Sequence, residues 1–151
     1  MAVTQNYVGK SVDLCVLETS ATPGLDDVLV GLTGGGSAIS GPYKVVQKFF
    51  KYLMTERGSV ASDADYGTVF IRKLLGGYIQ TSLGLSFEFY ADLPDAIRYI
   101  SASNLNPPAD ERLTEATLQS FNVTLDKATM VIKFTFEDSS TILAPVAIST
   151  V

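Results

Sequence analysis

The sequence predicts an α+β fold, in which central helices pack on a small antiparallel sheet formed mostly by the C-terminal third of the chain. Between Tyr43 and Ser103, apolar residues recur at the three- and four-residue spacing of helices. After Pro108 the spacing falls to two residues, as in strands with one buried face. The chain has 151 residues, which is enough for one domain with a hydrophobic core.

Residues 1–42 are expected to form an N-terminal strand and a Gly-rich arm, ahead of an α+β domain at 43–151. The β-branched and apolar run at 11–17 predicts the strand. Residues 19–42 contain three successive glycines and two pairs of adjacent Pro and Gly, and they predict a long loop with a short strand at 28–32. Long loops in compact domains are usually functional or disordered, so we expect the arm to become ordered on assembly.

The clearest helix is expected at 43–55, where apolar residues follow the helical period. Pro42 fits a first helical turn, and Gly58 is expected to cap the C-terminal end. The basic residues that lie between the apolar ones are Lys44, Lys48 and Lys51. They predict a solvated helix face, and a docking stripe for an acidic neighbour is the alternative.

Two further helices are expected before Pro108. The first spans 68–75 and ends at Gly76-Gly77. The second spans 86–103 and contains Pro94. Because proline lacks the N–H that a helix interior uses, Pro94 should kink this helix or divide it.

A β-hairpin with one buried face is expected after these helices, with its turn at Asp126-Lys127. The segment 118–125 alternates, and its apolar face consists of Phe121, Val123 and Leu125. The segment 130–137 also alternates, and its apolar face consists of Met130, Ile132, Phe134 and Phe136.

A third strand is expected at 141–148. Because Pro145 cannot donate to a ladder, this strand should lie at the edge of the sheet, next to a central strand at 130–137. An unpaired edge is either protected or used to recruit a strand from another chain. Three residues of this strand are therefore candidate partner contacts: Thr141, Ile142 and Ile148.

The composition excludes several kinds of site. The absence of histidine removes Ser-His-Asp and Cys-His catalysis and zinc sites that use imidazole. A single cysteine, Cys15, cannot form an internal disulfide. A net charge of −5 argues against a nucleic-acid partner, and no apolar run is long enough to span a membrane. The sequence contains no cofactor or metal motif, so neither is expected.

Acidic residues are the remaining candidates for catalysis. Glu56 with Asp63 or Asp65 could form the carboxylate pair that glycoside hydrolysis needs. Their positions at helix ends favour a local role instead, with Asp63 and Asp65 capping the second helix. An ion pair or a turn explains Asp110-Glu111, which lies beside Arg112. We therefore expect no enzymatic activity.

Several motifs occur in an informative order. An amphipathic helix ends in LMTERGS at 53–59, and a short acidic link leads to DYGT at 65–68, which opens a helix ending in LLG. A further helix, an acidic-Arg-Leu element and a hairpin follow. Over about 43–148, this order resembles the sheath-initiator (lysozyme-like baseplate wedge) family of contractile phage tails. That family has a Glu-Pro-Arg motif before its last strands; Glu111 and Arg112 match it, but the proline is absent.

The resemblance implies a structural protein of the virion, placed in the tail baseplate and assembled in the host cytoplasm. It would nucleate sheath assembly by strand exchange, repeated around a ring of six copies as in that family. The implied partners are the tail sheath protein, baseplate wedge proteins and the tail tube, with contacts at Glu111 and Arg112. Two alternatives stay open: another tail or head–tail adaptor protein, and a peptidoglycan hydrolase.

Overall fold

The computed structural model describes residues 13–14, 18–19, 28–29 and 38–150 of the chain. The helices are α1 (Pro42–Leu53), α2 (Phe70–Leu75), α3 (Ser82–Ala102) and the 3-10 helix η2 (Ala109–Glu111). The long strands are β5 (Leu113–Val123), β6 (Lys127–Phe136) and β7 (Thr141–Ser149). The short strands are β1 (Asp13–Leu14), β2 (Glu18–Thr19), β3 (Val28–Leu29) and β4 (Ala38–Ile39).

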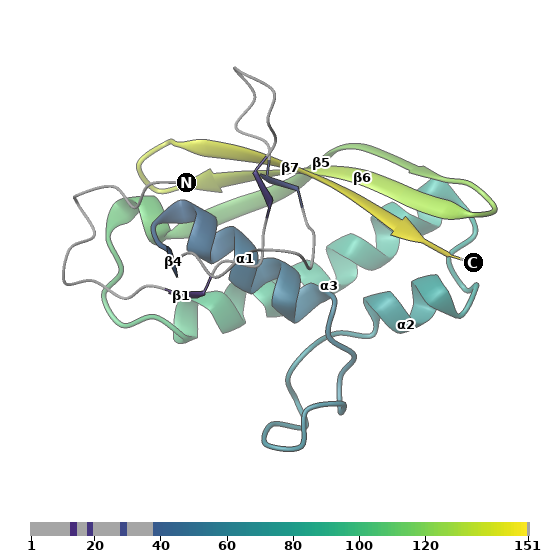
Figure 1. The fold of residues 1–151 in the computed structure, drawn as a ribbon, viewed down its shortest axis with the longest axis horizontal. Helices are drawn as coiled ribbons and strands as arrows, with labels where there is room; N and C mark the ends of the chain where they lie inside the picture. The colour runs from purple at the N-terminus through teal and green to yellow at the C-terminus, as the bar shows by residue number, and fades with distance from the viewer. Residues whose placement is uncertain (1–12, 15–17, 20–27, 30–37, 151) are drawn as a thin grey trace.

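These elements confirm the predicted α+β fold. The three long strands form one antiparallel sheet in the order β5-β6-β7, so β6 is central, as expected. Helices α1, α2 and α3 lie together on one side of this sheet (Figure 1). In the N-terminal part, β1 pairs with β4 and β2 pairs with β3. The remaining parts of the predicted arm, and Cys15, lie outside the described residues.

The core forms where α1 and α3 meet the sheet. Phe49 of α1 is fully buried, with its ring 5.0 Å from that of Phe134 on β6 and 6.2 Å from that of Phe89 on α3. All four residues of the predicted apolar face of β6 are buried, which confirms that prediction: Met130, Ile132, Phe134 and Phe136. The period-two pattern is accurate here because one face of β6 is buried along the whole strand.

Strand β5 differs from the prediction. Phe121 is exposed and Leu125 is 100% exposed, whereas Val123 is half-buried. The pairing of β5 with β6 shifts register between Leu118 and Ser120, and the strand ends at Val123. A register irregularity changes which side chains face the core, so the alternation read from the sequence does not hold across it.

Helix α3 is continuous through Pro94, so the predicted division does not occur. It also begins earlier than expected, at Ser82, because the Thr81 side chain accepts a hydrogen bond from the N–H of Gly84 at 3.0 Å. At the end of α1, the C-cap is Met54 and not Gly58, which lies in the following connection with φ +86°. Pro42 is the first residue of α1, as predicted.

Candidate partner-binding surface

The carboxylates considered for hydrolysis lie in the connection between α1 and α2. Glu56 forms an ion pair with Arg72 at 3.4 Å, and its backbone bridges to Thr68. Asp63 accepts a hydrogen bond from the backbone N–H of Asp65 at 3.2 Å. All three acidic residues are exposed, whereas a catalytic carboxylic acid is typically enclosed in an apolar pocket.

Asp63 and Asp65 do not cap α2, which corrects the expectation. The helix begins at Phe70, and its N-cap residue makes no side-chain hydrogen bond. The hydroxyl of Thr68 instead accepts a hydrogen bond from the N–H of Phe70 at 3.2 Å. The same hydroxyl donates to the carbonyl of Leu53 at 2.8 Å, so buried Thr68 connects the start of α2 to the end of α1.

Glu111 lies inside the protein. Its Oε2 atom is 2.8 Å from Nζ of Lys44, and the side chains of both residues are 2% exposed. Asn104 donates a second hydrogen bond to the same oxygen at 2.9 Å. The solvated face predicted for the basic stripe is therefore wrong for Lys44, because its ammonium group has a carboxylate partner in the interior.

The rest of the basic stripe is more accessible. Lys51 is exposed and pairs with Asp13 at 3.1 Å, and Lys48 is half-buried. Asp13 of β1 also accepts a hydrogen bond from Gln47 of α1 at 3.1 Å, so its side chain contacts α1. This contact connects the N-terminal strand predicted from the sequence with the α+β domain.

Arg112, unlike Glu111, lies on the surface. It forms an ion pair with Glu137 at 2.7 Å, and its Nε donates to the carbonyl of Pro107 at 2.9 Å. Of the two residues that match the family motif, Arg112 is the one that a partner can reach directly. Glu111 lines a cavity of about 450 Å³ together with residues 103–108, and its Oε1 has no hydrogen-bond partner among the described residues.

The outer edge of β5 is partly closed by α3. The hydroxyl of Tyr90 accepts a hydrogen bond from the N–H of Leu118 at 3.1 Å. The hydroxyl of Ser82 accepts one from the N–H of Val123 at 3.2 Å. Two main-chain donors that an incoming strand would need are thus already used within the molecule.

The edge formed by β7 differs from the β5 edge in the contacts of its residues. Thr141 is exposed, Ile142 is buried in the core, and Ile148 is half-buried opposite Ala128. Every residue of β7 pairs with β6 in an unbroken register, including Pro145. β3 contacts β7 but pairs with β2, so it is not a fourth strand of this sheet. This matches the predicted edge position of the third strand.

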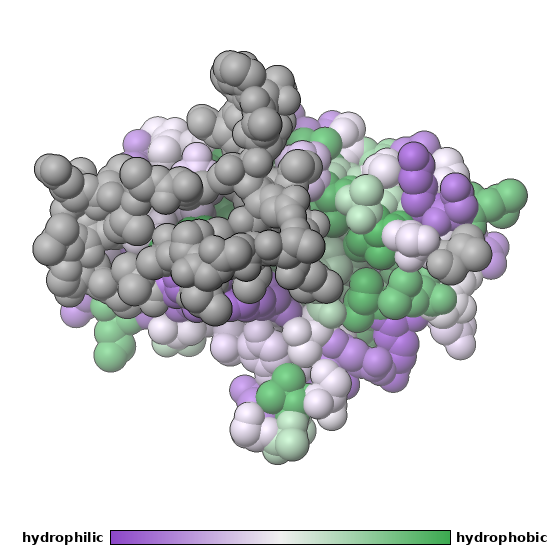
Figure 2. Space-filling model, viewed as in Figure 1, coloured by the Kyte–Doolittle hydropathy of each residue, from purple (hydrophilic) through white to green (hydrophobic). Residues whose placement is uncertain are grey.

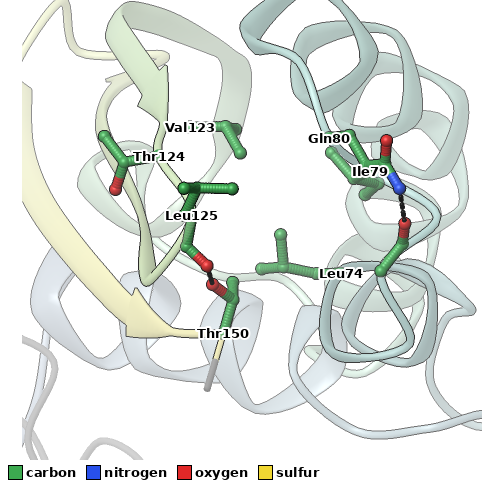
Figure 3. A pocket seen from close by; sticks show the side chains of 8 residues that line it. Leu74, Ile79, Gln80, Val123, Thr124, Leu125 and Thr150 are labelled. Carbon is green, nitrogen blue, oxygen red and sulfur yellow. Dashed lines mark hydrogen bonds between the residues drawn. The ribbon is translucent and has the colours of Figure 1, made fainter.

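One end of the molecule is apolar at its surface. A cavity of about 530 Å³ opens between the α2–α3 connection and the β5–β6 turn (Figure 3), lined by Leu74, Gly77, Ile79, Gln80, Val123, Thr124, Leu125 and Thr150. Figure 2 shows hydrophobic residues gathered over the end where α2 and the last residues of β7 lie. Sequence reasoning missed this cavity, because it assigned Leu125 and Val123 to the core.

Within the described part of the chain, no cluster of three or more His, Cys, Asp or Glu residues could hold a metal ion. None of the helices at 38–150 is long and apolar enough to cross a membrane. Comparison with protein-family models, with curated proteins and with solved structures finds no match to this chain.

Proposed function

We propose that the chain is a structural protein of a contractile phage tail baseplate, which nucleates sheath assembly by offering the edge of β7 to a strand of the sheath. It links the sheath to the wedge and the tube and is repeated around a ring. The observation that carries this proposal is the difference between the two edges of the sheet. α3 side chains use main-chain donors of β5. Among the described residues, β7 is the outermost strand on the other side, where β3 contacts it without pairing.

Strand addition suits β7 for a physical reason. An added strand gains most of its affinity from main-chain hydrogen bonds, and these tolerate changes of side chain. The core-facing residues of β7 fix the strand in place without using its outer edge: Ile142, Ala144 and Val146 are all buried. The edge is therefore held rigidly, which lowers the entropic cost of binding a partner strand.

The same edge would also serve another tail or head–tail adaptor protein. The proposal is specific to the sheath because of the order of motifs over about 43–148, and Arg112 is the motif residue available for a wedge contact. The exposed positions of Glu56, Asp63 and Asp65 give no support to a peptidoglycan hydrolase.

The test removes one main-chain donor from the edge. Proline is tolerated in a strand where its missing N–H would face away from the neighbouring strand, so Pro145 identifies the outward-facing set. N–H directions alternate along a strand, so exposed Ala147 belongs to that set. We expect Ala147→Pro to fold, to retain the β6–β7 pairing and to fail in seeding sheath polymerisation, measured by electron microscopy of baseplates mixed with sheath subunits.

Two matched variants complete this test. Ala147→Ser keeps the N–H and should seed normally. Gln119→Pro places a proline at the register shift of β5 and should also seed normally, since that edge is not used. Normal sheath yield and length with folded Ala147→Pro would refute strand addition at β7. A truncation after Ser140 is less informative, because it removes three buried residues of β7 from the core.

A further inference from the structure

The cavity of about 450 Å³ beside the loop 103–108, which joins α3 to η2, contains a buried carboxylate. The side chain of Glu111 is 2% exposed, and among the described residues that line the cavity it is the only charged one. Its Oε2 accepts hydrogen bonds from Lys44 and Asn104, whereas its Oε1 has no partner among the described residues. Because a buried acceptor without a donor is costly, this oxygen favours a ligand that donates to it.

The rest of the cavity lining is richer in acceptors than in donors. Pro107 and Pro108 have carbonyl groups but no N–H. The side-chain nitrogen of Asn104 already donates to Glu111, and the hydroxyl of Ser103 donates to a carbonyl of α3. A ligand of this cavity must therefore bring hydrogen-bond donors of its own.

The electrostatic surroundings favour a cationic donor. Burial raises the pKa of Asp110, and the charges of Glu111 and Asp138 add to the rise, so three carboxylates lie within electrostatic reach of one another here. The basic neighbour Arg112 is paired with Glu137. A cation that donates to a carboxylate forms a charge-assisted hydrogen bond, which is stronger than the bond from a neutral donor.

The outer part of the cavity is apolar. Leu105 is 93% exposed and lines the cavity together with Pro107, Pro108 and the buried Glu111. Since the leucine is exposed and the carboxylate is buried, a ligand meets apolar surface first and the charged group last. An aliphatic stem with a cationic end matches this order, as the side chains of lysine and arginine do on other apolar surfaces.

We propose that this cavity binds an alkyl cation, an ammonium or guanidinium group on an aliphatic stem, which donates to Oε1 of Glu111 while its stem lies on Leu105 and the two prolines. The cavity volume falls within the range of small-molecule sites. The same chemistry occurs in the side chains of lysine and arginine and in free diamines. The site does not involve the edge of β7, so it goes beyond the function proposed above.

The test is an NMR titration of the isotope-labelled full chain with butylammonium and butylguanidinium. We expect saturable shifts of amide signals within residues 103–111, with a Kd of about 1–10 mM, and no saturation with butanol, which has the same stem without the charge. A blocked arginine and 1,4-diaminobutane distinguish the two sources of the cation. Tighter binding of the blocked arginine assigns the site to a protein side chain, and tighter binding of the diamine assigns it to a free amine.

Matched variants test the carboxylate. Glu111→Gln keeps the shape of the side chain but not its charge and should weaken binding of both probes at least about tenfold. Asp110→Asn makes the same change at a neighbouring residue that does not line the cavity, so its Kd should stay within about twofold of the wild type. Lys44→Met/Glu111→Gln leaves no unpaired charge in the interior and should also lose binding.

The stem is tested separately at the exposed leucine. Leu105→Ser should fold like the wild type because the side chain is 93% exposed, and it should weaken butylguanidinium but not guanidinium itself.

Three results would overturn the proposal. The first is a wild-type chain that shows no saturable shift with either cation, which would mean that solvent alone satisfies Oε1. The second is butanol binding as tightly as butylammonium. The third is unchanged binding in folded Glu111→Gln or in the double variant. The titration uses the chain without any sheath protein, so its failure would leave the seeding test of Ala147→Pro unaffected.

Discussion

Lys44 and Glu111 bring two charges into the interior, and Asn104 adds a hydrogen bond to the same carboxylate oxygen. Removing both charges from water is costly, and the pair repays this cost only while both partners are present. The two residues connect α1 to the segment that leads into β5, so the pair fixes the position of the helix relative to the sheet.

We expect Lys44→Met to lower the free energy of unfolding by about 3–5 kcal/mol, because it leaves the carboxylate of Glu111 buried without its cation. The double variant Lys44→Met/Glu111→Leu should be more stable than Lys44→Met alone. Urea unfolding of the wild type, both single variants and the double variant measures the coupling. Additive losses in the double variant would show that the two side chains do not stabilise each other.

Asp92 on α3 is also largely buried, and its Oδ2 has no hydrogen-bond partner among the described residues. Burial raises the pKa of Asp92 above the ordinary range of an aspartate; Arg57 and Lys73 act in the opposite direction, and Glu88 and Asp95 add to the rise. The folded state therefore favours the protonated form. This contribution to stability is fully present below the pKa of the unfolded state and is lost as the pH rises through the raised pKa.

Asp92→Asn cannot ionise and should therefore be more stable than the wild type at neutral pH, by about 1 kcal/mol. The difference should shrink in acid, where Asp92 is protonated in both states. Urea unfolding at acidic and neutral pH measures it. Asp95→Asn is the control, because Asp95 accepts from Arg98 at 2.6 Å and its loss should bring no gain at neutral pH. A less stable Asp92→Asn at neutral pH would contradict this interpretation.

At the scale of elements, backbone hydrogen bonds join the two ends of the connection between α1 and α2. Thr68 donates its N–H to the carbonyl of Thr55 and accepts from the N–H of Arg57, both at 2.9 Å. Gly67, the residue before Thr68, has φ +96°. A Cβ at this position would collide with the carbonyl oxygen of Thr55. Only glycine allows the two backbone segments to approach this closely.

We expect Gly67→Ala to destabilise the protein by about 2 kcal/mol or more, because it adds a steric collision to an unfavourable φ. Gly58→Ala is the matched control: Gly58 also has a positive φ, of +86°, but nothing lies within 4 Å of an added Cβ. It should cost only about 1 kcal/mol. Thermal unfolding compares the two variants, and equal losses would show that the collision is relieved by a backbone shift.

Local patterns in the sequence predict elements well and their pairing less well. The alternation of β6 and the helical period of α1 were read correctly, because each depends on burial along one element. The register shift in β5 is set by its pairing with β6, and it could not be predicted from the residues of β5 alone. The burial of Lys44 depends on Glu111, which is distant in the sequence, so a helix-face pattern could not reveal it.

For the whole molecule, the sequence predicted one domain and an edge position for the third strand, but it could not tell which edge of the sheet is bonded by side chains of a helix. That property depends on Tyr90 and Ser82 reaching the main chain of β5, a contact between segments far apart in the sequence. The cavity at the end of the molecule was missed for the same reason, since it lies between the α2–α3 connection and the β5–β6 turn.

All three strands of the main sheet come from one continuous stretch that follows the helices along the chain. On a ribosome the helices emerge first, while the strands that will cover Phe49 and Phe89 have not yet been translated. The nascent chain therefore passes through an interval in which the apolar faces of the helices lack their cover. β7 is synthesised last of the three strands, and its buried side chains complete the core. A chain released before β7 is translated would lack Ile142, Ala144 and Val146, three residues that the core of the complete domain buries.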